Sequence, residues 1–304
     1  MSPPTTTSGT VPASDGVPLA WTRHAPPPDA EPRHTFVLVH GWSGSARYFD
    51  AVAGGLAARG SAVLTIDLRF HGASGPLPRP SAPTGATPPG AHVARLAVDL
   101  DNVLAALDVT DAVAVGTSMG ASILWCYGEL YGRGRVARVV CVDQAPLQNR
   151  THGWTSGSKG CYDAATLAGL QAAVRGDVEA FAAGNAAACL ARPVDQATLA
   201  LLASETARAC RDALAALMAD HTQLDWRPAV CVCPHETLVV VGGRSAIFPP
   251  DGCAWVARAA PAGQLVSFED CGHWLYIERG DEFVDVVWRW AEGERVDGEV
   301  VGGK

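Results

Sequence analysis

The sequence is short of positive charge and has no long apolar run. Its 304 residues carry 23 Lys and Arg against 31 Asp and Glu, a formal net charge of −8. This balance excludes a nucleic-acid binder that works through net charge, and the 48% of apolar residues excludes a disordered chain. The longest strongly apolar stretches, such as 35–39 and 238–241, have the length of strands, so no membrane-spanning helix is expected.

A secretory signal and a disulfide framework are also missing. The first twenty residues lack both the basic start and the continuous apolar segment of such a signal, so we expect a cytoplasmic protein. Nine cysteines, an odd number spread over a long chain, indicate reduced and mostly buried thiols. One group, Cys231, Cys233 and His235, resembles part of a metal site, but no second group completes four ligands. No metal or other cofactor is expected.

Short apolar runs alternate along the chain with segments of helical spacing. Apolar runs separated by amphipathic helices predict a doubly wound α/β core, with a mostly parallel sheet covered on both faces. The termini, 1–15 and 293–304, are expected to be flexible tails, and the six prolines of 75–90 predict an irregular loop. Strands are predicted at 17–23, 35–39, 62–66, 112–115, 136–142, 237–241 and 265–268, and core helices at 51–59, 93–107, 121–130, 252–259 and 281–291.

This alternation stops between residues 147 and 233, where the chain is rich in alanine and has helical spacing. Such a block between two core strands predicts an inserted helical cap at 147–233, with the core formed by 16–146 and 234–292. Helices are predicted within the cap at 164–174, 178–190, 196–209 and 211–218.

A candidate nucleophile lies between a predicted strand and a predicted helix. Gly116, Ser118 and Gly120 have the spacing GxSxG. A serine on such a turn is held in strained backbone geometry with its hydroxyl exposed, and flanking glycines remove side chains that would clash. The helix start also offers backbone N–H groups, including that of Met119, to a developing oxyanion.

A serine hydroxyl needs a base to remove its proton, and His273 is the candidate because it follows the last predicted core strand. The acid that orients the imidazole is less clear. Its usual place in this kind of fold, after the strand 237–241, is occupied by Ser245. Asp143, at the end of the strand 136–142, is the favoured acid because it lies at the carboxyl edge of the predicted sheet. Asp251 is the alternative, although capping a helix is its simplest role.

The residues around the candidate nucleophile complete the prediction. Loop 40–42, HGW, follows an early strand, so the backbone N–H of Trp42 is the expected oxyanion partner of Met119, and His40 is expected to brace the loop. Aromatic residues near the site and in the cap suggest a substrate with an apolar moiety. The tryptophans expected in the substrate pocket are Trp42, Trp154, Trp226 and Trp274.

These motifs together resemble the α/β-hydrolase superfamily from about residue 16 to residue 291. The matching segments are LVHGWSGS, IDLRFHGASG, VAVGTSMGAS, LVVVGG and CGHWLYIE, in the expected order. The resemblance implies a serine nucleophile at Ser118, a base at His273 and oxyanion N–H groups at Trp42 and Met119. Two positions depart from the pattern: Phe70 replaces a common glycine, and Ser245 stands at the usual acid site. Some lactone hydrolases and dehalogenases of the superfamily carry their acid where Asp143 lies.

The function expected from this resemblance is hydrolysis of a carboxylic ester or lactone of a mostly apolar small molecule through an acyl-enzyme. Fold alone does not choose among the activities of such a superfamily. Two alternatives therefore stay open: a small-molecule receptor or interaction protein with little turnover, and an acyltransferase.

Overall fold

The computed structural model describes residues 5–26, 31–75, 87–296 and 298–300. A single sheet forms the centre of the molecule, and its strands in spatial order are β1-β2-β4-β3-β5-β6-β7-β8-β9. Neighbouring strands from β4 to β9 are parallel, whereas β2 is antiparallel to both β1 and β4. The strands are Thr5–Pro12 (β1), Pro18–Ala25 (β2), Thr35–Val39 (β3), Ala62–Ile66 (β4), Ala112–Thr117 (β5), Val136–Val142 (β6), Glu236–Gly242 (β7), Gly263–Phe268 (β8) and Gly298–Val300 (β9).

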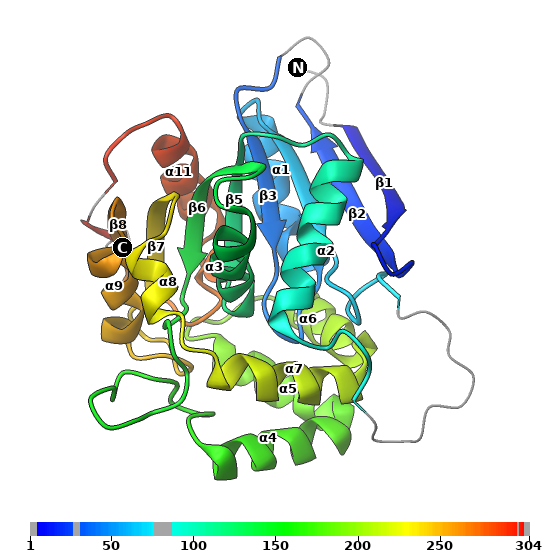
Figure 1. The fold of residues 1–304 in the computed structure, drawn as a ribbon, viewed down its shortest axis with the longest axis vertical. Helices are drawn as coiled ribbons and strands as arrows, with labels where there is room; N and C mark the ends of the chain where they lie inside the picture. Colours follow the sequence, from blue (N-terminus) through cyan, green and yellow to red (C-terminus); the bar gives the residue numbers. More distant parts are fainter. Residues whose placement is uncertain (1–4, 27–30, 76–86, 297, 301–304) are drawn as a thin grey trace.

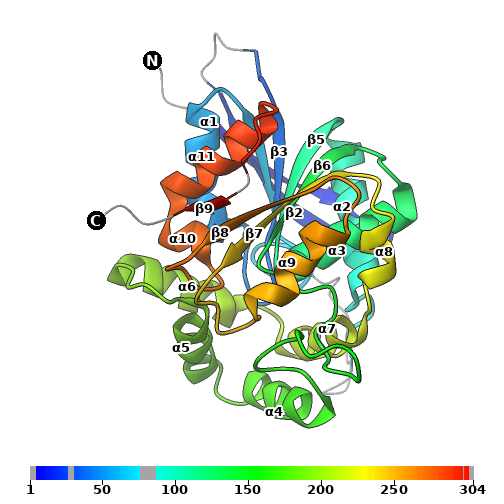
Figure 2. The ribbon, with the colours of Figure 1, turned by 90° about the vertical axis from the view of Figure 1, so that its left-hand side faces the viewer.

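Helices cover both faces of this sheet, which confirms the predicted doubly wound core (Figure 1, Figure 2). One layer contains α1 and α11, and the opposite layer contains α2, α3, α8 and α9. The core helices are α1 (Asp50–Ala58), α2 (Val93–Ala106), α3 (Met119–Tyr131), α9 (Pro250–Ala259), α10 (Leu275–Glu278) and α11 (Gly280–Ala291), with a short 3-10 helix η1 at Ala46–Phe49.

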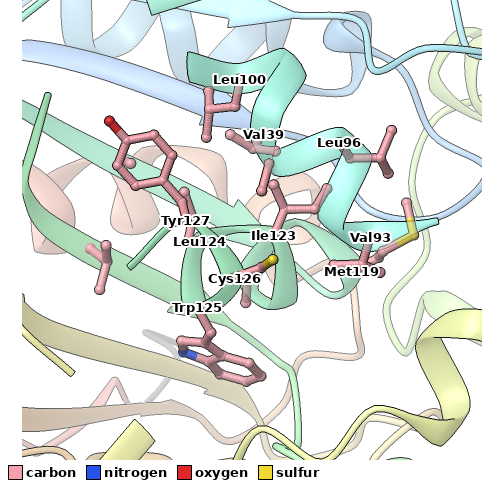
Figure 3. Close-up of a cluster of buried hydrophobic side chains, with 14 of the residues drawn as sticks. Val39, Val93, Leu96, Leu100, Met119, Ile123, Leu124, Trp125, Cys126 and Tyr127 are labelled. Carbon is pink, nitrogen blue, oxygen red and sulfur yellow. The ribbon is translucent and has the colours of Figure 1, made fainter. Parts of the chain in front are cut away.

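The central strands are apolar throughout because both of their faces are covered. Every residue of β5 is buried, and β3 is buried from Phe36 onward. Figure 3 shows part of the layer on one face, where Val93, Leu96 and Leu100 of α2 meet α3 residues such as Ile123. Burial of this size is the main favourable term in folding, so the core holds the strand ends in fixed positions.

Five helices lie between β6 and β7, the segment for which the sequence predicts an inserted cap. Figure 1 shows α4, α5, α6 and α7 together at one end of the sheet. They are preceded by an irregular stretch, and α8 returns the chain to the core beside α9. Their bounds are Ala164–Arg175 (α4), Val178–Cys189 (α5), Gln196–Arg208 (α6), Arg211–Gln223 (α7) and Arg227–Cys231 (α8). This segment is called the helical insertion below.

Part of each predicted flexible tail forms a strand, whereas residues 1–4, 297 and 301–304 lie outside the described residues. Residues 5–12 form β1, which pairs along its whole length with β2, and residues 298–300 form β9, which pairs with β8. The physical reason is that each segment finds an open edge of the sheet, where its backbone groups gain hydrogen-bond partners. The proline-rich loop predicted at 75–90 lies mostly outside the described residues, at 76–86.

Candidate active site

Ser118 lies on the sharp turn between β5 and α3. Its backbone has φ +52° and ψ −123°, a region that a residue with a side chain rarely adopts. The turn is tight on both sides, since a Cβ on Gly120 would clash with the carbonyl oxygen of Val39 and one on Gly116 would clash with the backbone of Gly120. The two glycines of the GxSxG pattern are therefore required by close packing, and they leave the serine at the N-terminus of α3.

His273 and Asp143 form a hydrogen-bonded pair at the same edge of the sheet. Asp143 follows β6 with φ +45° and is completely buried, while His273 lies in the loop between β8 and α10. The Nδ1 of His273 is 2.6 Å from Oδ2 of Asp143. Two further donors serve this carboxylate: the N–H of Gly242 reaches Oδ1 at 3.1 Å, and the hydroxyl of Ser245 reaches Oδ2 at 2.7 Å.

Asp251, the alternative acid, is exposed in the first turn of α9. A carboxylate at that place is favoured by the positive end of the helix dipole, which explains its presence without any role at His273. Of the two aspartates that the sequence offered, Asp143 is the one that the structure brings into contact with the imidazole.

The loop after β3 is held against Ser118 by a buried histidine. The N–H of Leu68 donates to Nε2 of His40 at 3.0 Å, so the ring hydrogen lies on Nδ1, which donates to the carbonyl oxygen of Gly41 at 2.8 Å. Burial lowers the pKa of His40 to about 4, so the ring is neutral at pH 7. A Cβ on Gly41 would stand 3.0 Å from Cβ of Ser118, which places the backbone of Gly41 beside the serine.

A cavity of about 430 Å³ opens beside Ser118 and His273. Its floor comes from the core, and most of its wall comes from the helical insertion, including Leu170 and Ala173 of α4, Phe181 of α5 and Met218 of α7. Polar groups are few: Gln148, Ser158 and Asn185 lie among the lining residues. Among the described residues that line it, none is Asp, Glu, Lys or Arg.

Two of the four tryptophans expected in the pocket line this cavity, namely Trp42 and Trp274. Trp42 stands edge-on to Phe181, with ring centroids 5.7 Å apart, and its indole N–H donates to the carbonyl oxygen of Leu214 at 2.8 Å.

Trp154 and Trp226 do not line the cavity, so this part of the sequence prediction is wrong. Both are buried in the core instead. Trp154 packs edge-on against Trp255 and donates its indole N–H to Leu147, and Trp226 immediately precedes α8. A buried aromatic residue more often serves packing than ligand contact, and these two follow that rule.

Phe70, the first departure from the resemblance, has a structural explanation. Its φ is +72°, a conformation that suits the glycine common at this position. The phenylalanine side chain is buried in the core, and its carbonyl oxygen accepts the N–H of Cys210 at 2.9 Å. The strain at this residue is therefore offset by burial and by a tie to the helical insertion.

The model of the family described as the alpha/beta hydrolase fold matches residues 34–280. The chain belongs to this family. Among curated proteins, the sn-1-specific diacylglycerol lipase ABHD11 of Mus musculus is 26% identical over 276 residues, which cover 83% of this chain and 78% of that protein.

Solved structures share the fold of this hydrolase. An esterase from Exiguobacterium antarcticum superposes with a TM-score of 0.83 at 18% identity, over 94% of this chain and all of the other. The enol-lactonase of Burkholderia xenovorans superposes with a TM-score of 0.73 at 19% identity, with the same coverage. At such low identity the likeness concerns the fold alone.

Sequence reasoning missed the contact that Ser245 makes in this hydrolase. The residue stood out only as a departure from the acid site, whereas the structure places it in contact with Asp143. The signal was present in its position, because the turn after β7 and the turn after β6 lie side by side in a parallel sheet. No sequence pattern marked Asn185 or Gln148 as cavity residues, since both come from the irregular or helical parts of the insertion.

Within the described residues, none of the helices of this hydrolase is long and apolar enough to cross a membrane. All nine cysteines are free thiols. No group of three or more His, Cys, Asp or Glu residues in the described part of the chain is arranged to hold a metal ion.

Proposed function

We propose that this hydrolase cleaves a carboxylic ester or lactone of an uncharged, mostly apolar small molecule through an acyl-enzyme. The observation that carries the proposal is the pair of His273 and Asp143, 2.6 Å apart, at a cavity that Ser118 also lines. A serine becomes a useful nucleophile only beside a base, and a base works best when a third group orients it.

The roles follow from the hydrogen bonds. Because an ionised carboxylate only accepts, Asp143 holds the ring hydrogen of His273 on Nδ1 and leaves Nε2 free to accept the Ser118 proton. The serine oxygen then attacks the carbonyl carbon, and His273 returns the proton to the departing alkoxide. Water, activated by the same nitrogen, adds to the acyl-enzyme and releases the acid and the free serine.

The oxyanion of each tetrahedral intermediate needs donors beside Ser118. The N–H of Met119, at the start of α3, is one, since helix N-termini offer unpaired donors and a favourable dipole. The N–H of Trp42 is the other, because its loop lies against the serine. In this proposal, His40 contributes by fixing the loop and takes no proton from substrate.

The cavity supports the choice of substrate. Its volume of about 430 Å³ fits a small molecule, and binding sites for such molecules are mostly apolar with a few placed polar groups. The absence of Asp, Glu, Lys and Arg among its described lining residues argues for an uncharged substrate, since a buried charge without a partner is costly. The helical insertion then acts as a cap that selects the substrate, and the ester-cleaving activity named for the mouse relative supports an ester bond as the target.

The first test uses a fluorophosphonate, which reports an activated serine without the natural substrate. Wild type and Ser118→Ala are incubated with the reagent, and intact mass is measured. We expect one adduct on the wild type and none on Ser118→Ala. In a separate assay, the unlabelled wild type should turn over small neutral p-nitrophenyl esters. Absence of an adduct on the intact, folded wild type would contradict the proposal.

Turnover then separates this proposal from its two alternatives. A receptor would give a stable adduct with esters after one event, whereas an esterase gives repeated release of acid. Added short alcohols distinguish an acyltransferase, because a dry site would yield the new ester in preference to the acid.

A further inference from the structure

Ser245 occupies the turn after β7, the place where an orienting acid is expected in this fold. The side chain is completely buried. Its hydroxyl lies 2.7 Å from Oδ2 of Asp143, the same oxygen that meets Nδ1 of His273 at 2.6 Å. The serine therefore lies next to the carboxylate oxygen through which Asp143 acts on the imidazole.

The direction of this hydrogen bond is fixed by the surrounding backbone. The N–H groups of Ile247 and Phe248 both point at Oγ of Ser245, each at 3.3 Å. A hydroxyl has one proton to give and two acceptor sites, so these two donors occupy its lone pairs and leave the proton for Asp143. The turn itself is tied to the helical insertion, because Nζ of Lys159 donates to the carbonyl oxygen of Ser245 at 2.5 Å.

We propose that Ser245 is a positioning residue that acts through Asp143, and this inference rests on the proposed function. The Asp143 carboxylate is completely buried and receives donors from Gly242, Ser245 and His273. Without the hydroxyl, the carboxylate keeps only the Gly242 N–H and the His273 ring itself as donors, so no group besides the imidazole holds Oδ2 in place. Oδ2 then loses its fixed direction toward Nδ1, and the imidazole loses the orientation that general-base catalysis needs.

The same geometry suggests a variant in which the acid is moved. Since the Ser245 hydroxyl and Nδ1 of His273 both contact one oxygen of Asp143, a carboxylate at position 245 would enter the same hydrogen-bonded group as the imidazole. Asparagine suits position 143 in this exchange because it tolerates the positive φ of +45° found there. The variant Asp143→Asn with Ser245→Asp therefore carries a single carboxylate on the opposite side of the pair.

The first arm of the test removes the hydroxyl. Ser245→Ala is expected to lower kcat by about 10-fold to 100-fold, the range for a lost hydrogen bond to a charged group, with KM changed less than about twofold. Ser245→Thr, which keeps the hydroxyl, should recover most of the activity. Ser61→Ala is the matched control, since Ser61 is equally buried and its hydroxyl has no partner in the described part of the chain. Wild-type kcat in folded Ser245→Ala would overturn the inference.

The second arm moves the acid. Asp143→Asn alone is expected to lose about 10⁴-fold in kcat, and adding Ser245→Asp should recover at least about tenfold. Ser245→Asp alone should be harmful because two carboxylates would then share one site. Residues in one network are expected to couple. If the fold loss of kcat in the double variant equals the product of the losses in the two single variants, position 245 cannot serve His273.

A third readout separates this inference from the proposed function. The proton on Nδ1 of His273 gives a far-downfield NMR signal when it is held by a carboxylate, and it needs no substrate. The signal should move or broaden in Ser245→Ala and stay in place in Ser61→Ala. If Ser118 is not labelled but the Nδ1 proton signal still changes in Ser245→Ala, the hydrolase proposal alone is refuted. If Ser118 is labelled normally and Ser245→Ala leaves both the signal and kcat unchanged, the positioning role alone is refuted.

Discussion

The two halves of the cavity are built in different ways. In α3, which carries the Ser118 side, nine of thirteen residues are buried, whereas in α4, on the opposite wall, Val174 is the one buried residue. Few buried apolar contacts mean a low free energy of local opening. The core half therefore holds the reacting groups in register, and the α4 part of the insertion can adapt to a substrate or admit it.

This contrast predicts that substitutions in the core half act on kcat. Asp143→Asn should lower kcat by about 10⁴-fold while the protein stays folded, because an amide in place of the carboxylate favours the wrong tautomer of His273. Turnover of a p-nitrophenyl ester and the thermal unfolding midpoint check both parts. Asp251→Asn is the control and should keep wild-type kcat, since that side chain is exposed on α9. The reverse result would move the acid role to Asp251.

Substitutions in the insertion half should act on KM. Phe181→Ala removes an aromatic wall that stands against Trp42, and Leu170→Ala shortens the wall from α4. Each should raise KM for an apolar ester by about tenfold, the value of roughly two lost methylenes, with kcat changed less than about threefold. Leu167→Ala, on the same helix but outside the cavity, is the matched control. A large fall in kcat in Phe181→Ala would break the division of roles.

The pH dependence of the free energy of unfolding tests a buried histidine from each half. Burial lowers the pKa of His40 to about 4 and that of His221, in α7, to about 3. Each ring is neutral when folded and takes up a proton on unfolding below pH 6.5, so the free energy of unfolding falls as the pH falls from about 6.5 toward those values.

Replacing each of the two histidines by leucine should change the free energy of unfolding in opposite directions. Neither ring nitrogen of His221 has a partner in the described residues, whereas both nitrogens of His40 are bonded. His221→Leu should raise the free energy of unfolding by about 1 kcal/mol at pH 5 and flatten its pH dependence, while His40→Leu should lower it. Urea unfolding at pH 7.5 and pH 5 measures both. Destabilisation by His221→Leu would show that its ring has a partner in solution.

The smallest effect is expected where the two halves are joined by a single part-buried hydrogen bond. Lys159→Met removes the bond from its ammonium group to the Ser245 carbonyl. Amide hydrogen exchange across 243–249 should accelerate by about threefold, with kcat nearly unchanged, because one hydrogen bond contributes only about 1 kcal/mol on balance. Arg175→Met is the control, since Arg175 bonds Asp212 within the insertion. Equal exchange in both variants would show that Lys159 does not tie the insertion to the turn.

The core strands were predictable because burial on both faces forces a continuous apolar run. The predictions for β3, β4 and β6 agree with the structure at both ends, and α3 begins at Met119, directly after the serine. The positions of Ser118, Asp143 and His273 at one sheet edge follow from the parallel topology, which brings the carboxyl ends of strands together.

The N-terminal strand escaped prediction because composition outweighed a local signal. Pro, Ser and Thr suggested a flexible segment, but Asp15-Gly16 is a typical hairpin turn, and Gly16 has φ +85°. The turn is also fixed from a distance, since the guanidinium of Arg69 bonds Asp15 at 3.0 and 3.1 Å. That contact spans more than fifty residues and leaves no trace in the local sequence.

The tryptophans of the insertion could not be assigned for a similar reason. Trp154 and Trp226 lie in the core and Phe181 lies in the cavity, yet all three are aromatic residues of one segment. Which of them faces the cavity depends on how the helices cross, and a periodic pattern does not encode that.

The two edges of the sheet are formed by segments outside the family match at 34–280. β1 satisfies the outer hydrogen-bonding groups of β2, and β9 does the same for part of β8. An uncovered strand edge is a template for pairing with another chain. Removing the first fifteen residues would leave Ser118, Asp143 and His273 in place but turn β2 into an open edge, so we expect the shortened protein to associate through that edge before it loses the geometry of this site.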